Sequence, residues 1–317
     1  MKTRQLGKSG PLLTEIGLGA WAIGGAWKWG WGHSDDQESA RAIHRSLDLG
    51  INWIDTAAVY GLGHSEEVVG KALHGKRDSV FLATKCGLVW ENSVDPPRRH
   101  LGRKSIRKEM EDSLRRLGTD HVDLYQFHWP DFDTPVEESW SEMVQLRKEG
   151  KTRFIGVCNF DVMLLERCEK IAHVQSLQPI YNMLERDIEA EELPYCRKNG
   201  IGVVAYSPMQ SGLLTGKFDK SKLAPDDWRQ ESDKFAGTNL EKGLKLADQL
   251  RPIAAKYRKT VGQLTVAWVL ANDAVTSAIV GARTGRHAEE NVGAAGWTIE
   301  PRDLETLELL LKEGATV

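Results

Sequence analysis

The chain has 317 residues, of which 41% are hydrophobic and 27% charged, so it can bury a sizeable core and remain soluble. Its formal net charge of −3 and the lack of long like-charged blocks give no reason to expect nucleic acid or an anionic membrane surface as a partner. Neither a signal peptide nor an apolar run near the roughly 18 residues of a membrane span occurs, and four cysteines without CxxC spacing indicate reduced thiols, so we expect a cytoplasmic protein.

Short apolar runs that predict strands alternate with amphipathic stretches that predict helices. Residues 3–17 contain a Gly-Lys-Ser-Gly turn between two strand-like pieces and predict a β-hairpin. The later strand runs are mostly continuous in apolar residues, which is typical of strands covered on both faces. In chain order, the predicted strands lie at 16–20, 52–56, 80–85, 122–128, 153–158, 174–179, 202–207 and 276–281. The predicted helices lie at 36–49, 65–74, 104–117, 136–149, 161–171, 189–199, 260–271 and 301–313, with a short one at 286–295.

About eight repeats of strand and helix predict a (β/α)8 TIM barrel with parallel strands, in which the N-terminal hairpin plugs the floor. No domain boundary is evident, so residues 1–317 are expected to form a single domain. The segments 21–36 and 208–259 are longer than connections require and follow strands, which predicts long loops at the carboxyl face where barrel active sites lie. The competing interpretation is a dinucleotide-binding doubly wound fold, because GLGAWA at 17–22 matches G-x-G-x-x-A, although no helix follows it.

Ionisable residues stand at the ends of three neighbouring predicted strands. Asp55 follows NWI, Lys85 follows FLAT and His128 follows LYQF. Because parallel barrel strands end on one rim and lie about 4.8 Å apart, these side chains can meet across a pocket. A buried Asp55 needs a cationic partner, and Lys85 supplies one. Tyr60, in the loop after Asp55, is expected beside this pair.

These side chains suit proton donation to a carbonyl oxygen. The ordinary pKa of a phenol is ~10, and the ammonium of Lys85 is expected to lower the pKa of Tyr60 by roughly two to three units. Asp55 would keep Lys85 charged, and His128 would hydrogen-bond the same substrate oxygen. The carbonyl carbon then needs a hydride, for which a nicotinamide fits. The alternative is a Schiff base on Lys85, as in barrel aldolases, but a charged and paired lysine is a poor nucleophile.

Several motifs together resemble the aldo-keto reductase family, closest to its bacterial general-stress reductases and near the beta subunits of voltage-gated potassium channels. The resemblance implies a (β/α)8 barrel whose catalytic tetrad falls on Asp55, Tyr60, Lys85 and His128. It further implies reduction of aldehydes or ketones with NADP(H), in which Tyr60 is the general acid. The motifs are GLGAW (17–21), NWIDTAAVYGLGHSEEVVGKAL (52–73), ATKCG (83–87), DLYQFHWPD (123–131), IGVCNF (155–160), QPIYNMLER (178–186), AYSPMQSGLLTGK (205–217) and GARTGRHAEEN (281–291).

The resemblance also implies contacts for the cofactor and the substrate. Tyr206 would stack under the nicotinamide ring, with Asn159 and Gln178 holding its carboxamide. This chain has Cys158 where the family has serine, and His287 where relatives often have arginine or glutamine. The implied cofactor contacts are Trp21, Asn159, Gln178, Tyr206, Ser207, Met209, Gln210, Ser211, Gly212, Leu213, Lys217, Gly281, Arg283, Thr284, His287, Glu290 and Asn291. The implied substrate contacts are Trp21, Tyr60, His128 and Trp129.

The expected partner is a small carbonyl or alcohol substrate, and the resemblance allows a homo-oligomer. No metal site is expected, because the nine histidines include no HExxH and lysine is a poor ligand. A second functional hypothesis is a nicotinamide-binding redox sensor with slow catalysis, as the channel subunits suggest. Tryptophans on carboxyl-face loops are expected to wall the substrate pocket, namely Trp21, Trp27, Trp29, Trp31, Trp90 and Trp129.

Overall fold

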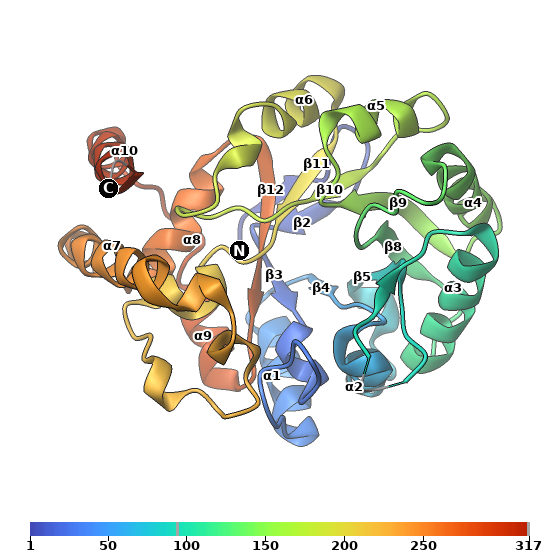
Figure 1. Ribbon diagram of the computed structural model, residues 1–317, viewed down its shortest axis with the longest axis horizontal. Coiled ribbons are helices and arrows are strands. Elements are labelled where there is room, and N and C mark those ends of the chain that lie inside the picture. Colours follow the sequence, from blue (N-terminus) through green and yellow to red (C-terminus); the bar gives the residue numbers. More distant parts are fainter. Residues whose placement is uncertain (93–94, 316–317) are drawn as a thin grey trace.

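A closed barrel of eight parallel strands forms the centre of the molecule in our computed structural model, which describes residues 1–92 and 95–315 (Figure 1). Strands that follow one another in the barrel sequence are hydrogen-bonded neighbours, and the last pairs with the first. The expected (β/α)8 TIM barrel is therefore confirmed, and the doubly wound alternative is wrong. The strands are β3 (Ile16–Gly19), β4 (Trp53–Asp55), β5 (Phe81–Cys86), β8 (Val122–Phe127), β9 (Thr152–Cys158), β10 (Ser176–Gln178), β11 (Gly202–Ala205) and β12 (Val275–Gly281).

Helices surround the barrel at positions close to those that periodicity predicts. They are α1 (Asp36–Asp48), α2 (His64–Ala72), α3 (Arg103–Leu117), α4 (Val136–Lys148), α5 (Val162–Glu169), α6 (Glu192–Asn199), α8 (Val261–Ala271), α9 (Gly285–Val292) and α10 (Pro301–Ala315). The helix at α8 begins with a capping box, in which the side chains of Thr260 and Gln263 each accept a backbone N–H of the other residue. Within the described ranges, no helix is both long and apolar enough to span a bilayer.

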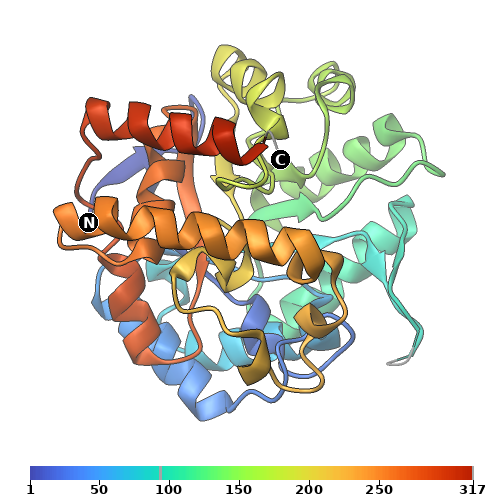
Figure 2. The same ribbon diagram turned by 60° about the vertical axis from the view of Figure 1, so that its left-hand side comes forward.

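The segment 208–259 contains a helix that the sequence analysis did not predict. Helix α7 (Gly237–Lys256) has 20 residues and contacts α10 on the outside of the barrel ring (Figure 2). Residues before it form four short 3-10 segments, which are Gln210–Thr215, Lys220–Lys222, Trp228–Gln230 and Asp233–Phe235. The long carboxyl-face loop is therefore shorter than expected and ends where α7 begins.

The N-terminal hairpin closes the floor of the barrel, as expected. Its strands β1 (Thr3–Gln5) and β2 (Leu12–Thr14) pair antiparallel. Leu6 and Leu13 are fully buried in one cluster with Trp53 of β4. A Cβ on Gly202 would lie 2.4 Å from a methyl carbon of Leu6, so this close approach requires glycine. The floor is apolar and tightly packed, and it leaves the opposite rim for chemistry.

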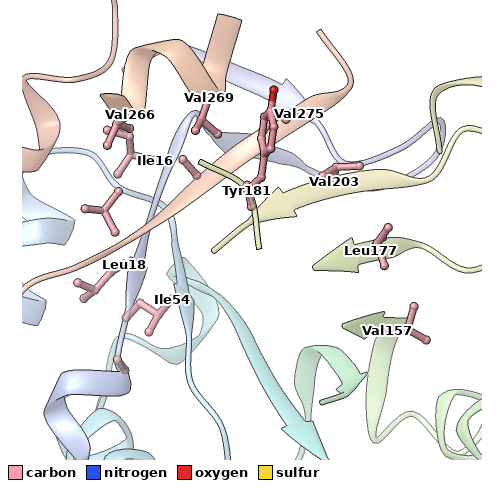
Figure 3. Close-up of a cluster of buried hydrophobic side chains, with 14 of the residues drawn as sticks. Ile16, Leu18, Ile54, Val157, Leu177, Tyr181, Val203, Val266, Val269 and Val275 are labelled. Atoms are coloured by element: carbon pink, nitrogen blue, oxygen red, sulfur yellow. The ribbon is translucent and has the colours of Figure 1, made fainter. Parts of the chain in front are cut away.

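Alternation along each strand divides the core into two layers. Side chains such as Ile54 and Val157 point outward into a large cluster with α8 and the other helices (Figure 3). Their neighbours Trp53, Phe81 and Leu124 point inward and fill the barrel. The same period of two then continues to the strand ends, and it decides which polar side chains enter the barrel mouth.

Candidate active site

Strand register brings the predicted ionisable residues to one level of the barrel. Asp55 of β4 pairs with Ala83 of β5, and Lys85, two residues further on, pairs with Gln126 of β8. His128 lies two residues beyond Gln126. Lys85 therefore lies two residues beyond the partner of Asp55, and His128 lies two residues beyond the partner of Lys85. This stagger matches the tilt of barrel strands and keeps the three side chains at the same height.

The ammonium of Lys85 is held by three acceptors. Its Nζ donates to Asp55 Oδ2 at 2.6 Å, to the carbonyl oxygen of Thr56 at 3.0 Å and to Tyr60 Oη at 3.3 Å. The other carboxylate oxygen of Asp55 accepts from Gln178 Nε2 at 2.8 Å. Lys85 and Asp55 are 1% and 2% exposed, so both charges lie out of water and every N–H of the ammonium has a partner.

Tyr60 reaches this pair from the loop that follows β4. The loop turns tightly because Gly61 has φ +62° and packs on the loop after β3, where a Cβ on Gly61 would lie 2.1 Å from the carbonyl oxygen of Gly24. Glycine is required at this close approach. The Tyr60 ring meets the His128 ring edge to face, with centroids 5.6 Å apart. The tyrosine side chain therefore lies beside both the ammonium of Lys85 and the imidazole of His128.

Burial, rather than the ammonium, has the largest effect on the phenol. It raises the pKa of Tyr60 to about 12, Lys85 lowers this pKa in part, and Asp55 raises it. The expectation of a lowered pKa is therefore wrong, because desolvation of the phenolate outweighs the attraction of Lys85. Tyr60 carries its proton throughout the neutral range.

Lys85 and His128 have opposite protonation states. Burial lowers the pKa of Lys85, but Asp55, together with smaller contributions from Tyr60 and Cys158, more than offsets this effect, so the net pKa is raised and the ammonium stays charged. Burial and then Lys85 hold the pKa of His128 well below its ordinary value, so the imidazole is neutral. Its Nδ1 is buried without a hydrogen-bond partner among the described residues.

The thiols beside these groups are unreactive. Burial raises the pKa of Cys86 well above its ordinary value, and its side chain lies in the outer core, as strand alternation predicts. Cys158 faces the barrel mouth, and burial raises its pKa too, despite the opposing effect of Lys85. Neither thiol is a nucleophile at neutral pH.

Strained backbone gathers at the carboxyl ends of β9 and β11. Asn159, Ser207, Gln210 and Ser211 have φ values of +58°, +53°, +46° and +48°, which non-glycine residues rarely adopt. Asn159 is fixed by two hydrogen bonds, since its Nδ2 donates to the carbonyl oxygen of His128 at 3.1 Å and its Oδ1 accepts from Tyr206 Oη at 3.0 Å. Strain of this kind clusters at ligand sites, where the surrounding structure enforces it.

A cavity of about 770 Å³ opens above these groups. Its volume lies in the upper part of the usual range for small-molecule and cofactor sites. Of the predicted cofactor and substrate residues, it is lined by Trp21, Tyr60, His128, Trp129, Asn159, Gln178, Tyr206, Ser207, Met209, Ser211, Gly212, Lys217, Gly281, Arg283, His287, Glu290 and Asn291. Asp55 also lines it, with Lys85 behind.

Three predicted cofactor residues lie outside this lining. Gln210 is 5% exposed and its Nε2 donates to Glu185 Oε1 at 3.2 Å, while Leu213 is 1% exposed. The side chain of Thr284 caps α9 by accepting the N–H of His287. At the start of α9, Arg283 and His287 face the cavity, and Lys217 pairs with Glu290 at 2.7 Å.

Tryptophans wall one side of the cavity. Trp21, Trp27, Trp29, Trp31 and Trp129 line it as expected, whereas Trp90 does not. The sequence analysis missed Trp228 and Arg229, which lie in the 3-10 turn after Asp227.

Contacts between distant loops hold these two residues over the barrel mouth. Trp228 lies 5.4 Å from Trp21 between ring centroids, and the Arg229 guanidinium lies 4.1 Å from the centroid of Trp31. Arg229 also pairs with Asp227 at 2.6 Å. Because these contacts join the loops 21–36 and 208–236, no local sequence signal identifies them.

The mouth of this TIM barrel holds a protonated tyrosine beside a buried lysine–aspartate pair, under a cavity large enough for a cofactor. This combination is typical of one class of barrel oxidoreductases. Comparison with known proteins agrees. The family model for the aldo/keto reductase family matches residues 15–312. This chain therefore belongs to the aldo/keto reductase family, whose members are oxidoreductases that use nicotinamide cofactors and act on carbonyl compounds.

Individual relatives cover almost the full chain. An aldo-keto reductase of Bacillus subtilis (strain 168), YhdN, is 40% identical over 98% of this chain and 94% of its own length. The NADH-specific methylglyoxal reductase of Escherichia coli (strain K12) is 37% identical over 96% of both chains. A glycerol dehydrogenase from Gluconobacter oxydans has a solved structure that superposes with a TM-score of 0.89 at 39% identity, over 100% of this chain and 97% of that one.

Proposed function

We propose that this protein reduces aldehydes and ketones to alcohols with NADPH, and that Tyr60 donates the proton. The observation that carries the proposal is the direction of the Lys85–Tyr60 hydrogen bond. All three acceptors of the ammonium are assigned, so Lys85 donates to the phenol oxygen and the phenol hydrogen must point elsewhere. The phenol lines the cavity, so this hydrogen is available to a substrate oxygen there.

Each member of the tetrad then has one task. Tyr60 gives its proton to the carbonyl oxygen, and the charge of Lys85 stabilises the phenolate that is left. Asp55 holds Lys85 in place and offsets its charge. The neutral imidazole of His128 donates a hydrogen bond to the same carbonyl oxygen and so fixes its orientation. A paired ammonium whose pKa is raised is a poor nucleophile, which argues against the Schiff-base alternative.

The residues of the cavity suit a nicotinamide dinucleotide. When bound, the reduced nicotinamide supplies the hydride that the carbonyl carbon requires. Tyr206 offers a flat ring held by Asn159. The strained backbone from Ser207 to Gly212 lies where its remaining N–H groups would contact a pyrophosphate, since those of Gln210 and Gly212 already donate within the loop.

Cationic side chains at the far end of the cavity support a preference for NADPH over NADH. Arg283 lines the cavity, and within the described part of the chain its guanidinium donates only from Nη1 to the carbonyl oxygen of Trp31, at 3.4 Å, so it keeps donors for a 2′-phosphate. His287 lies one helical turn further on, at the start of α9. One relative is named as NADH-specific, so the preference of this chain needs measurement.

The proposal predicts that the purified protein oxidises NADPH with 4-nitrobenzaldehyde or methylglyoxal, and that kcat/KM for NADPH exceeds that for NADH. Replacing Arg283 by Gln should lower kcat/KM for NADPH by about tenfold and leave that for NADH nearly unchanged, because only NADPH carries the 2′-phosphate. Both are measured from initial rates of absorbance loss at 340 nm. Equal kcat/KM values that Arg283→Gln does not alter would contradict the NADPH assignment, and no turnover with either cofactor would contradict the function.

The raised pKa of Tyr60 predicts different pH dependences for the two directions of the reaction. Below a pKa of about 12 the phenol is protonated, so this group causes no loss of the reduction rate between pH 6 and pH 9. Alcohol oxidation needs the phenolate, whose fraction rises about tenfold per pH unit below the pKa. We therefore expect kcat/KM for alcohol oxidation to rise steadily over that range. A plateau near pH 8 would show that the pKa of the base is much lower.

A further inference from the structure

The entrance of the cavity carries a cation that the proposed mechanism does not use. Arg99 lies in β7 (Arg98–Arg99), which pairs antiparallel with β6 (Leu88–Val89) in the loop after β5. Its guanidinium carbon lies 5.0 Å from the ring centroid of Trp129, the residue directly after His128. Arg99, Trp129 and His128 line the same cavity.

Among the described residues 1–92 and 95–315, this guanidinium has no hydrogen-bond partner and no carboxylate within ion-pair distance. Its side-chain contact there is the stacking on Trp129. The other exposed or half-buried cations around the cavity are engaged on the cofactor side, where Lys217 pairs with Glu290 and Arg283 donates to Trp31. Arg99 is therefore the free cation on the substrate side of the described cavity.

The surroundings of Arg99 favour an anion near it. The two acidic residues that line the cavity are already paired, Asp55 with Lys85 and Glu290 with Lys217. Stacking on Trp129 holds the plane of the guanidinium while leaving its N–H edge free, and that edge matches the two oxygens of a carboxylate.

We propose that Arg99 selects carbonyl substrates that carry a carboxylate at the end remote from the aldehyde or ketone. The carbonyl oxygen lies at Tyr60 and His128, the carbon chain crosses the indole of Trp129, and the carboxylate meets Arg99 at the cavity entrance. This inference rests on the proposed function and adds a substrate class to it. Arg99 acts in binding alone, so its contribution should appear in KM for the anionic substrate.

Matched substrates separate charge from shape. The first pair is 4-carboxybenzaldehyde and its neutral methyl ester, and the second is succinic semialdehyde and butanal. We define the carboxylate preference as the ratio of kcat/KM for the anionic member to that for the neutral member. For an exposed guanidinium, we expect Arg99→Gln to lower this preference by about fivefold in at least one pair. Arg99→Lys, which keeps the charge without the planar edge, should lower it less.

The same hairpin offers a matched control. Arg98 lies on the opposite face of β7 and does not line the cavity. Arg98→Gln therefore removes an equal charge nearby and should leave the carboxylate preference unchanged. Raising NaCl from 20 to 500 mM should reduce the preference of the unaltered protein and have little effect on Arg99→Gln.

Two outcomes would overturn the inference: a preference in both pairs that Arg99→Gln does not change, or an equal fall in Arg98→Gln. Failure to reduce either member of both pairs would instead contradict the proposed function, and the inference with it. Turnover of any of the four substrates therefore distinguishes a failure of the inference from a failure of the proposed function.

Discussion

Replacing Tyr60 by Phe should lower kcat for aldehyde reduction by about 10³-fold, within the range that general acids contribute. Among the residues that the structure describes, Tyr60 carries the only hydroxyl that both touches Lys85 and lines the cavity, and the substitution removes it. Water is a poor replacement because it lacks the fixed position of the phenol oxygen beside Lys85. The measurement is the steady-state rate with 4-nitrobenzaldehyde at saturating NADPH.

Cofactor binding should survive this change, because the ring of Tyr60 remains and the proposed dinucleotide contacts come from other strands. Titration of NADPH by quenching of tryptophan fluorescence should give a Kd within about twofold of the unaltered protein. Tyr195→Phe removes a phenol hydroxyl on α6, outside the cavity lining, and serves as the control that should keep full activity. A Tyr60→Phe protein that turned over at more than a tenth of the normal rate would remove Tyr60 from the mechanism.

Replacing Lys85 by Met should both abolish turnover and destabilise the fold. The change leaves the carboxylate of Asp55, which is 2% exposed, with Gln178 as its remaining side-chain partner. An uncompensated buried charge of this kind costs about 3–5 kcal/mol, and the free energy of unfolding in urea should fall by that amount. Loss of the charge beside the phenolate should also lower kcat by at least about 10²-fold.

A double substitution separates the two effects. Asp55→Asn combined with Lys85→Met leaves no buried charge at this position, so most of the lost stability should return. Turnover should not return, because the phenol still lacks its ammonium. If the double variant were destabilised by the sum of the two single effects, the two charges would not be coupled as the 2.6 Å contact indicates.

The barrel and the position of the tetrad were predictable because both follow from local pattern. Continuous apolar runs identified the strands, and three neighbouring runs ended on an ionisable residue with the parity that points into the barrel. Asp55, Lys85 and His128 share that parity, as the register of β4, β5 and β8 confirms. Cys86 has the opposite parity, and it lies in the outer core as predicted.

Features that depend on contacts between distant loops were not predictable. Helix α7 opens with Gly-Thr-Asn and contains Pro252, so its propensity signal is weak, and packing on α10 supplies stability that the segment itself does not show. Trp228 and Arg229 line the cavity because they pack against Trp21 and Trp31, which lie some two hundred residues earlier in the chain.

The pKa of Tyr60 was mispredicted for a related reason. The charge of Lys85 is readable from the sequence, but its effect must be weighed against the depth of burial, which only the assembled barrel defines. In the folded protein, burial affects the pKa of Tyr60 more than Lys85 does, and the phenol stays protonated. That form is the one that reduction requires.

The central claim is that the cofactor gives hydride to a carbonyl group that Tyr60 protonates. The most direct test uses NADPH that carries deuterium in both positions on C4 of the nicotinamide ring. The purified protein is incubated with this cofactor and 4-nitrobenzaldehyde in ordinary water, and the alcohol is analysed by mass spectrometry. We predict one deuterium on the carbinol carbon and none exchanged from solvent at that carbon, with no alcohol formed in parallel by Tyr60→Phe. An unlabelled alcohol, or labelled alcohol formed equally well by Tyr60→Phe, would contradict the account.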